Sequence, residues 1–337
     1  MKPSVSFVWR RLLSISCILF TLLLVAMFLG LCAGSSGIDF ISFIKTLTKS
    51  PYTDTMLHDI IWQIRFPRVI LALMVGSTLS LGGLVFQALL RNPLAEPYIL
   101  GISGGAAIGA IIGIITGLSR FPGVGLAAFG GSISTVIVLL FVISGRSMIK
   151  SDVLLLSGVM VNAFCSAVIM FLVSITQDAR LHNIIFWLMG DLSVAETGHI
   201  RFLFFMLSPC FILVFLLSHS MNLLLLGQEI AQTTGVNIRG VTIALLVTTS
   251  FMVSVTVSYC GLIGFVGLVM PHFLRLSIGA DHRILVPACV LAGGSYLVLC
   301  DMLARVLPEQ GEMPVGIVTA MVGAPLFIYL LKRSKVR

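Results

Sequence analysis

The chain has 337 residues, of which 58% are hydrophobic and only 10% are charged, against about 25% charged residues in an average soluble domain. A mean hydropathy of +1.11 excludes an ordinary soluble globular protein. The composition predicts an all-α polytopic membrane protein, and the formal net charge of +8 must be explained within that class.

Stretches without charged residues should mark the transmembrane helices, because charge is costly at the bilayer centre and a helix needs about 20 residues to cross it. The stretch 240–274 has 35 residues, or about 52 Å of helix, which is too long for one crossing. We expect a tight turn at Tyr259-Cys260-Gly261 to divide it. The sequence thus predicts ten transmembrane helices, within residues 12–38, 69–90, 97–119, 121–145, 153–177, 202–228, 240–274 (two helices), 284–300 and 313–331.

The distribution of charge predicts the orientation, because Lys and Arg favour cytoplasmic loops. With both termini inside, 13 of the 21 basic residues and 4 of the 13 acidic residues lie in the cytoplasm, a net charge of 13 − 4 = +9. The outside then carries 8 − 9 = −1. Orientation therefore explains the total of +8 without a nucleic-acid partner.

We expect one transmembrane domain over residues 1–337. The first apolar run, Leu12–Leu31, follows Trp9-Arg10-Arg11 and lacks a clear small-x-small cleavage site, so we expect a retained helix and not a removed signal peptide. The seven cysteines lie mostly in apolar stretches and lack C-x-x-C spacing, which favours packing over metal or redox chemistry. The 32 glycines favour close helix packing in lipid.

A proline-containing elbow follows the second predicted helix. Asn92-Pro93 and Glu96-Pro97 bias the backbone away from helix on the cytoplasmic side. This pattern fits a tight membrane turn and, equally well, a rigid elbow close to a transport path.

A polar segment follows the sixth predicted helix and lies within Leu223–Thr242. Gly227 ends the apolar run, Gln228 and Glu229 open the polar segment, and Gly235 supplies a turn. A short helix with small side chains at the membrane surface would fit a groove on another protein, although an ordinary polar connector has the same composition.

Several single polar residues have structural explanations. Asn162 and Ser166 fit hydrogen bonding between helices, and residues 184–189 fit a short amphipathic helix on the outer side. His272 has no partner at ligand spacing, so we expect no metal site there. Asp301 and Arg305 have the favourable i, i+4 order for a helical ion pair.

Several long motifs resemble the permease subunits of bacterial ABC importers for iron chelates, haem and cobalamin, the FecCD-type family. The resemblance runs from about residue 60 to the C-terminus and is looser over 111–225. It is carried by R-F-P-R at 65–68, Q-A-L-L-R-N-P-L-A-E-P at 87–97, G-I-S-G-G-A at 101–106, and by residues 261–283, 301–305 and 314–331.

This resemblance implies the fold of an ABC type II importer permease in the bacterial cytoplasmic (inner) membrane. It implies a second copy of the permease, two ABC ATPase subunits and an external substrate-binding protein as partners, besides membrane lipid. The implied cargo is a metal chelate, for which we expect a ferric siderophore, the commonest cargo of such proteins; haem, cobalamin and oxyanions such as molybdate are the alternatives.

The resemblance also implies three sets of functional residues. The loop after the sixth helix would couple to the ATPase, arginines at the outer mouth would bind acidic residues of the substrate-binding protein, and two inner stretches would form the cytoplasmic gate. Asp152 departs from the small hydroxyl residue usual at its position. The coupling residues are Gly227, Gln228, Glu229, Ala231, Thr234, Gly235 and Arg239; the docking residues are Arg65, Arg68 and Arg305; the gate residues are Asn92, Leu94, Ser151 and Asp152.

Other classes of function find less support in the sequence. The chain has no G-x-x-x-x-G-K-[ST], so ATP and Mg²⁺ would bind to a partner subunit; we expect no cofactor and no catalytic residue in this chain. A free-standing ion-coupled transporter would usually carry acidic residues at mid-membrane, whereas the charged residues here fall near helix ends. A membrane-bound enzyme is not indicated, because the sequence has no G-x-S-x-G motif and no paired carboxylates within a predicted helix.

Overall fold

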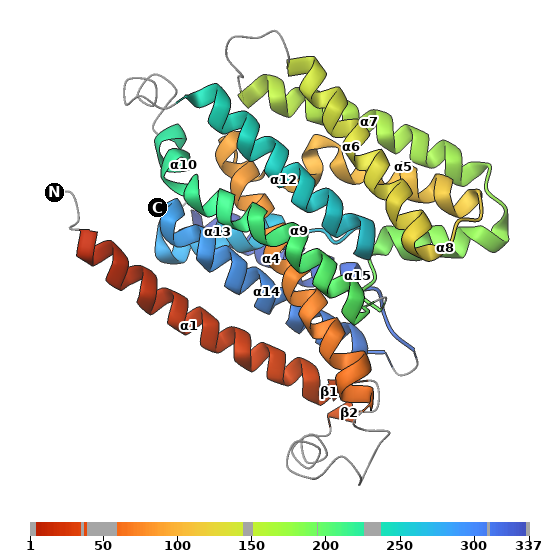
Figure 1. Cartoon of the computed structure of the whole chain (residues 1–337), viewed down its shortest axis with the longest axis horizontal. Coiled ribbons are helices and arrows are strands. Elements are labelled where there is room, and N and C mark those ends of the chain that lie inside the picture. Colours follow the sequence, from red (N-terminus) through yellow and green to blue (C-terminus); the bar gives the residue numbers. More distant parts are fainter. Residues whose placement is uncertain are drawn as a thin grey trace.

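The computed structural model describes residues 5–34, 37–38, 59–143, 151–193, 195–225, 237–308 and 311–334. Over these ranges the chain is a bundle of helices (Figure 1), and the single strand pairing joins β1 (Ala33–Gly34) antiparallel to β2 (Gly37–Ile38). The long helices are α1 (Val5–Cys32), α4 (Phe66–Leu89), α6 (Gly125–Ile143), α7 (Ser151–Ser174), α9 (Thr197–Leu216), α12 (Ile238–Cys260), α14 (His282–Val306) and α15 (Val315–Ser334). The shorter ones are α5 (Ile102–Ile115), α8 (Asp178–Met189), α10 (Ser218–Leu225), α13 (Val266–Ile278), η1 (Ile60–Arg65), η2 (Pro97–Leu100) and η3 (Arg120–Val124).

The ten predicted transmembrane helices are all found in the described residues. Eight helices are long and apolar enough to cross a membrane, and α5 and α13 are two shorter apolar ones. The predicted division of 240–274 is confirmed, since α12 ends at Cys260 and α13 begins at Val266. At 1.5 Å per residue α5 and α13 are only about 20 Å long, so each depends on irregular chain beside it to complete the crossing.

The sixth predicted helix occupies only part of the charge-free stretch 202–228. The structure begins α9 at Thr197, ends it at Leu216, and starts a separate helix, α10, at Ser218. A charge-free stretch does not locate the end of a helix, because Asn222 is polar but uncharged and bonds to the loop before α14. The amphipathic helix expected over 184–189 is also longer than predicted, because it begins at Asp178.

Helix α4 lies at the centre of the bundle, where it contacts α12, α13 and α14 (Figure 1). Glycine permits the closest of these contacts: a Cβ atom on Gly83 would lie 1.8 Å from the carbonyl oxygen of Gly267 on α13. Nearer the start of α4, a Cβ atom on Gly76 would lie 2.3 Å from the carbonyl oxygen of Gly293 on α14. Small residues thus bring three helix backbones together, as the glycine content predicts.

Two irregular segments meet beside α4 and fix the short helices. Both α5 and α13 begin after a residue in the left-handed conformation, Gly101 (φ 80°) and Phe265 (φ 68°). The side chain of Glu96 accepts a hydrogen bond from the Phe265 backbone N–H at 2.9 Å. The Tyr98 hydroxyl donates to the Ile263 carbonyl at 3.0 Å and accepts from its N–H at 3.1 Å. The backbone between α12 and α13 is therefore hydrogen-bonded by side chains from the elbow after α4.

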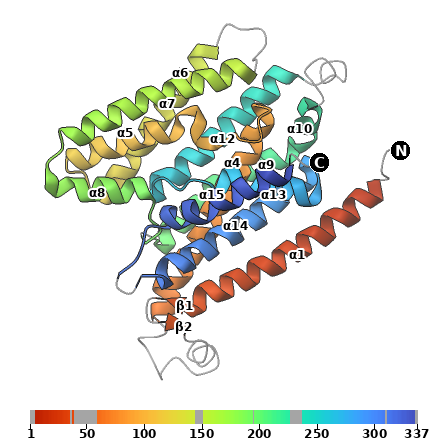
Figure 2. The ribbon, with the colours of Figure 1, turned by 180° about the vertical axis from the view of Figure 1, so that it is seen from behind.

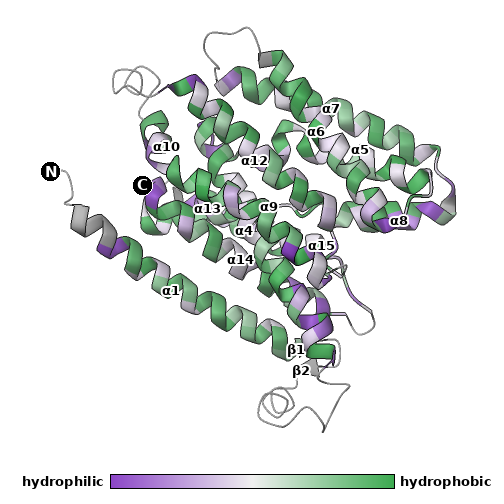
Figure 3. Ribbon diagram, in the orientation of Figure 1, coloured by the Kyte–Doolittle hydropathy of each residue, from purple (hydrophilic) through white to green (hydrophobic). Residues whose placement is uncertain are grey.

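The bundle has two ends that match the predicted orientation. The N and C marks lie at one end of the bundle, and β1, β2 and the start of α4 lie at the other (Figures 1 and 2). Apolar residues cover most of the helices, whereas hydrophilic residues gather near helix ends and on α8 (Figure 3). We use inner for the end with the termini, which the charge distribution assigns to the cytoplasm, and outer for the opposite end.

Candidate functional site

Four helices converge at the inner end, and we call this place the inner junction. The last turn of α4, the first turn of α7, the end of α10 and the start of α12 enclose a cavity of only about 10 Å³, so their side chains are in close contact. The inner junction is lined by Ala88, Leu89, Arg91, Ser151, Leu154, Leu224 and Thr242.

The inner junction brings together the two stretches predicted to form a cytoplasmic gate. The Ser151 hydroxyl donates to the carbonyl oxygen of Leu89 at 3.1 Å, which joins the start of α7 to the end of α4. Beyond α4, the Asn92 side chain accepts a hydrogen bond from the Leu94 N–H at 2.9 Å and shapes the elbow as a tight turn. Leu94 and Asp152 are exposed.

Arg91 connects this elbow to α10. Its backbone has φ 48°, a left-handed conformation that is uncommon outside glycine, and its guanidinium donates to the carbonyl oxygen of Leu224 at 2.9 Å. Lys and Arg at the end of a helix satisfy carbonyls that have no partner within the helix, and Leu224 lies in the last turn of α10. Sequence reasoning missed this residue as a functional candidate, although it lies inside the 87–97 motif.

The middle of α10 is held by the loop before α14. The Asn222 amide donates to Asp281 at 2.7 Å, and its oxygen accepts from the His282 N–H at 2.9 Å. Partial burial would raise the pKa of Asp281, but hydrogen bonds from Arg283 and Asn222 outweigh it and lower that pKa to about 2. Asp281 therefore stays charged and holds α10 against α14 at neutral pH.

The predicted ATPase-coupling residues Gly227, Gln228, Glu229, Ala231, Thr234 and Gly235 lie outside the described residues. The two helices that border them are described. Helix α10 ends at Leu225, and α12 begins after Asn237, whose side chain caps the helix by accepting from the Gly240 N–H at 3.0 Å. Arg239 lies in the first turn of α12 and is exposed. Both borders of the predicted loop thus lie beside the inner junction.

Five charged residues form a cluster at the opposite end, and we call it the outer ion cluster: Arg65, Arg68, Asp301, Arg305 and Glu312. Arg68 Nε lies 2.9 Å from Asp301 Oδ1, and the Arg68 guanidinium also pairs with Glu312. Arg305 Nε lies 3.1 Å from Asp301 Oδ2, so the predicted Asp301–Arg305 pair is confirmed. Asp301 is fully buried between the two arginines, which compensates its desolvation.

The same cluster caps the end of α1. Arg305 donates to the carbonyl oxygens of Gly30 and Ala33 at 2.9 and 3.0 Å, and Arg65 donates to those of Leu31 and Cys32 at 2.9 and 3.0 Å. Cations at a helix C-terminus are favourable because they face its negative dipole end and its unpaired carbonyls.

The burial of the outer ion cluster decides which of the predicted docking arginines reach the surface. Arg68 and Arg305 are only 5% and 3% exposed, so in this conformation their guanidinium groups bind partners within the chain and do not reach the surface. Arg65 is half-buried, and Glu312, which the sequence did not single out, has a side chain that is 41% exposed. The placement at the outer end agrees with the predicted topology, while docking itself stays a prediction.

The fold, the inner junction and the outer ion cluster together indicate the class of protein. The chain is a polytopic transport permease with the fold of type II ABC importers. It belongs to the FecCD transport family, whose model matches residues 22–333.

Individual relatives and structures agree with that membership. The chain is 40% identical over 319 residues to the vitamin B12 import system permease protein BtuC of Klebsiella pneumoniae, which covers 94% of this chain and 92% of the relative. It is 38% identical over 327 residues to the BtuC of Salmonella typhimurium, covering 96% and 95%. An inward-facing metal-chelate type ABC transporter matches with a TM-score of 0.85 and 31% identity, covering 95% of this chain and 99% of the other. PsaBC from Streptococcus pneumoniae shares the fold, with a TM-score of 0.56 and 17% identity over 87% of this chain.

These findings confirm the family and fold predicted from the motifs. They also confirm a multi-pass protein of the bacterial inner membrane and a transport permease, which is not a class of enzyme.

Proposed function

We propose that the chain moves a corrinoid, vitamin B12 or a close analogue, into the cytoplasm as the permease of an ABC importer. The observation that carries the proposal is the 40% identity to a vitamin B12 permease over 94% of this chain and 92% of that relative. The family match over residues 22–333 includes the inner junction and the outer ion cluster.

The ferric siderophore expected from the sequence becomes the second candidate. It is supported by the similarity to a metal-chelate type transporter at 31% identity. The relatives named for vitamin B12 are more similar to this chain, so they favour the corrinoid. An ion-coupled secondary transporter, the other alternative, has no support from the family.

The energy would come from two ATPase subunits that bind ATP and Mg²⁺, because this chain has no phosphate-binding motif. A second copy of the permease would complete the transport path, and a substrate-binding protein would deliver the cargo at the outer end. In this arrangement the permease itself needs no cofactor.

The contacts at the inner end support a route for coupling. An ATPase that moves the loop 227–239 would act on α10 and on the start of α12, which border it. Helix α10 is bonded through Leu224 to Arg91 of the elbow. The end of α4, just before the elbow, is bonded to Ser151. Movement of the loop would thus reach all four proposed gate residues, Asn92, Leu94, Ser151 and Asp152, through one set of contacts.

At the outer end, docking of the binding protein would involve the outer ion cluster in two ways. Arg65 and Glu312 reach the surface and would set the charge that the partner meets. Arg68 and Arg305 would act from below by holding Asp301, Glu312 and the end of α1 in place. Reversing Arg68 would add a carboxylate beside Asp301, so loss of uptake in that variant would report misfolding and not docking. Arg65 also binds the carbonyl groups of Leu31 and Cys32, so Arg65→Gln tests docking, read as docking affinity against ionic strength, only when its unfolding midpoint equals that of the wild type.

The test of the proposed function is uptake in a host that lacks its own vitamin B12 permease. The chain is produced with its ATPase and binding protein, and uptake of radiolabelled cyanocobalamin is compared with uptake of a radiolabelled ferric siderophore. We expect ATP-dependent accumulation of cyanocobalamin at least tenfold above that of the siderophore. The reverse ratio would establish the second candidate, and no ATP-dependent uptake of either would contradict both.

A further inference from the structure

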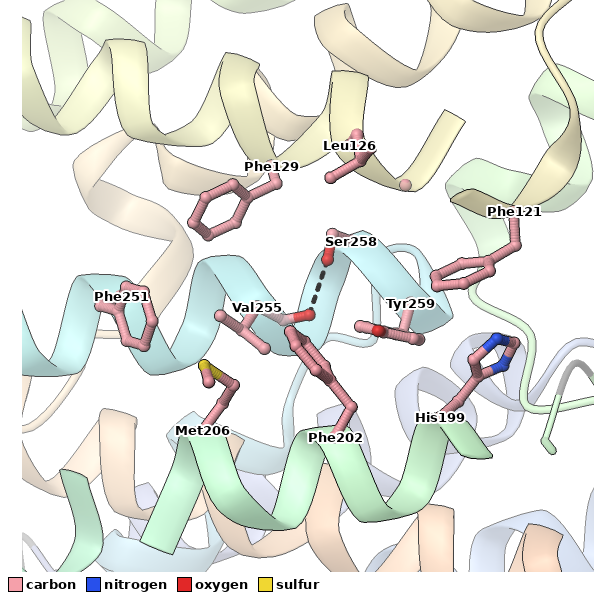
Figure 4. A pocket seen from close by; sticks show the side chains of 11 residues that line it. Phe121, Leu126, Phe129, His199, Phe202, Met206, Phe251, Val255, Ser258 and Tyr259 are labelled. Carbon is pink, nitrogen blue, oxygen red and sulfur yellow. Dashed lines mark hydrogen bonds between the residues drawn. The ribbon is translucent and has the colours of Figure 1, made fainter. Parts of the chain in front are cut away.

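An apolar groove runs down the outer half of the bundle, away from the inner junction and the outer ion cluster. Helices α6 and α9 both pack on α12, and between them they leave a cavity of about 560 Å³ with α12 as its floor (Figure 4). Phe129 projects from α6, Phe202 and Met206 from α9, and Val255 from α12. The volume lies within the range of pockets that hold a small organic ligand.

The groove extends from the outer ends of the helices towards the membrane centre. On α9 its lining reaches from His199 to Met206, eight residues that span about 10 Å of helix. Phe202 and Met206 are 49% and 36% exposed, so the groove is open on one side and not sealed inside the bundle. The hydroxyl of Ser258, on its floor, already donates to the Val255 carbonyl at 2.7 Å, and the other lining hydroxyl belongs to Tyr259 at the outer mouth (Figure 4). Hence the walls offer a ligand chiefly apolar contact.

The outer mouth of the groove is different, because the small cavity that adjoins it there is lined by Arg120 and Asp191. The rings of Phe121 and His199 are in contact there at a tilt of 54°, with centroids 3.9 Å apart, beside Tyr259. Arg120, next to Phe121, pairs with Asp191 and keeps an exposed guanidinium. Glu196, one turn before His199, is 76% exposed at its side chain. Burial would raise the pKa of Asp191, but hydrogen bonds from Ser193 and Arg120 outweigh it and lower that pKa, so Asp191 is charged at neutral pH.

We propose that the groove binds one acyl chain of a zwitterionic phospholipid of the outer leaflet, phosphatidylethanolamine. The acyl chain lies between α6 and α9 against Phe202, Met206 and Val255. The phosphate accepts hydrogen bonds from Arg120, whose five N–H donors exceed the needs of Asp191. The ammonium group faces Asp191 and Glu196.

The observations favour this occupant over the transported cargo or a protein segment. A metal chelate presents many polar groups, and the groove walls would desolvate these without offering hydrogen bonds. A docked helix that is apolar throughout would match the walls but would leave the charged mouth unmatched. A zwitterionic phospholipid has an apolar chain of the right character and both charges at one end.

The test is native mass spectrometry of the purified full-length chain after delipidation in detergent and addition of palmitoyl-oleoyl-phosphatidylethanolamine. We expect one tightly held lipid per chain. Met206→Trp fills the groove and should reduce this occupancy at least fivefold. Ile212→Trp adds the same side chain to an exposed position of α9 outside the groove lining, so it should leave occupancy unchanged.

Two results would overturn the proposal. One is equal occupancy in the Met206→Trp and Ile212→Trp variants, which would mean that the lipid binds elsewhere; the other is the absence of a retained lipid in the wild type. Palmitoyl-oleoyl-phosphatidylglycerol tests the head group separately, because it lacks the ammonium. Retention of phosphatidylglycerol as strong as that of phosphatidylethanolamine would overturn the assignment of a zwitterionic head group, even where Met206→Trp fails to fold.

Discussion

At the scale of single residues, Asp301 has the most demanding surroundings in the described part of the chain. Its side chain is fully buried near the outer end of α14, between Arg68 and Arg305. An isolated charge at such a place would be strongly unfavourable, whereas two arginines and the carbonyl groups that they bind share the desolvation cost. The arginines in turn depend on Asp301, because without it two buried positive charges face each other.

Replacing Asp301 by Asn should therefore lower the free energy of unfolding by about 3–5 kcal/mol, the usual cost of leaving a buried ion-pair partner alone. Thermal and denaturant unfolding of the detergent-solubilised chain would measure it. Arg283→Gln is the control, because it also breaks an ion pair, with Asp281, but at a site where the arginine is 44% exposed. That variant should lose less than about 1 kcal/mol. Equal losses in the two variants would rule out the buried network as a major source of stability.

The sequence predicts part of this network and not the rest. The i, i+4 spacing predicts the pair of Asp301 with Arg305, because a helix places those side chains on one face. It does not predict Arg68 as a partner of the same carboxylate, since 233 residues separate them. The charges also look exposed in the sequence, because they lie near helix ends. Only the packing of α1, α4 and α14 encloses them.

At the scale of elements, glycine decides how α4 packs. The backbones of α4 and α13 approach so closely at Gly83 that no side chain fits against Gly267. A backbone carbonyl cannot rotate away as a flexible side chain does, so added bulk must push the helices apart. This packing also positions Gln87, whose side chain amide lies 3.4 and 3.3 Å from the Gly267 and Leu268 carbonyl oxygens.

Gly83→Ala should accordingly destabilise the chain by about 1–3 kcal/mol or prevent insertion of a folded form. Gly130→Ala is its matched control on α6, where a Cβ atom would meet nothing within 4 Å. There the better helix propensity of alanine should make the change neutral or stabilising by up to about 1 kcal/mol. The two unfolding midpoints provide the comparison, and a midpoint for Gly83→Ala equal to that of Gly130→Ala would contradict the packing argument.

The number and order of the transmembrane helices follow from the sequence because charge is excluded from the bilayer centre wherever the chain folds. The bounds follow less well. Leu217, where α9 gives way to α10, lies in a stretch without charges, so hydropathy cannot locate it. The shortness of α5 and α13 depends on Glu96 and Tyr98, which hydrogen-bond an irregular backbone far along the chain. Such long-range pairings leave no periodic signal.

At the scale of the whole molecule, the described contacts join the ends of four helices at the inner junction. Helix α10 contacts α4, α9 and α14, so a force on the loop that follows it is shared by the centre of the bundle. The family resemblance predicts both a gate and a coupling loop at the inner end. The structure adds the connection between their described parts, from Leu224 to Arg91 and from Leu89 to Ser151.

Ala231→Trp in the coupling loop should leave the permease folded and inserted but abolish transport-linked ATP hydrolysis, because the added bulk would not fit the groove proposed on the ATPase. A second readout is crosslinking between cysteines introduced at Leu94 and Asp152, which should depend on nucleotide in the wild-type loop and not in the variant. Cys17 is exposed and is first replaced by serine, whereas the other six cysteines are buried. Ile137→Trp, at an exposed position of α6, is the control for bulk. Normal ATPase stimulation in Ala231→Trp would remove the loop from the mechanism.

The capped end of α1 has a consequence for the order in which the protein assembles during synthesis. Helix α1 leaves the ribosome long before α14, yet it packs mainly on α14, and Arg305 of α14 binds the carbonyl groups at its end. Residue 282, where α14 begins, follows Cys32 by 282 − 32 = 250 residues. At about 5–20 residues per second, α1 would wait roughly 12–50 seconds in the membrane for its partner. The synthesis of α14 therefore completes the docking of α1.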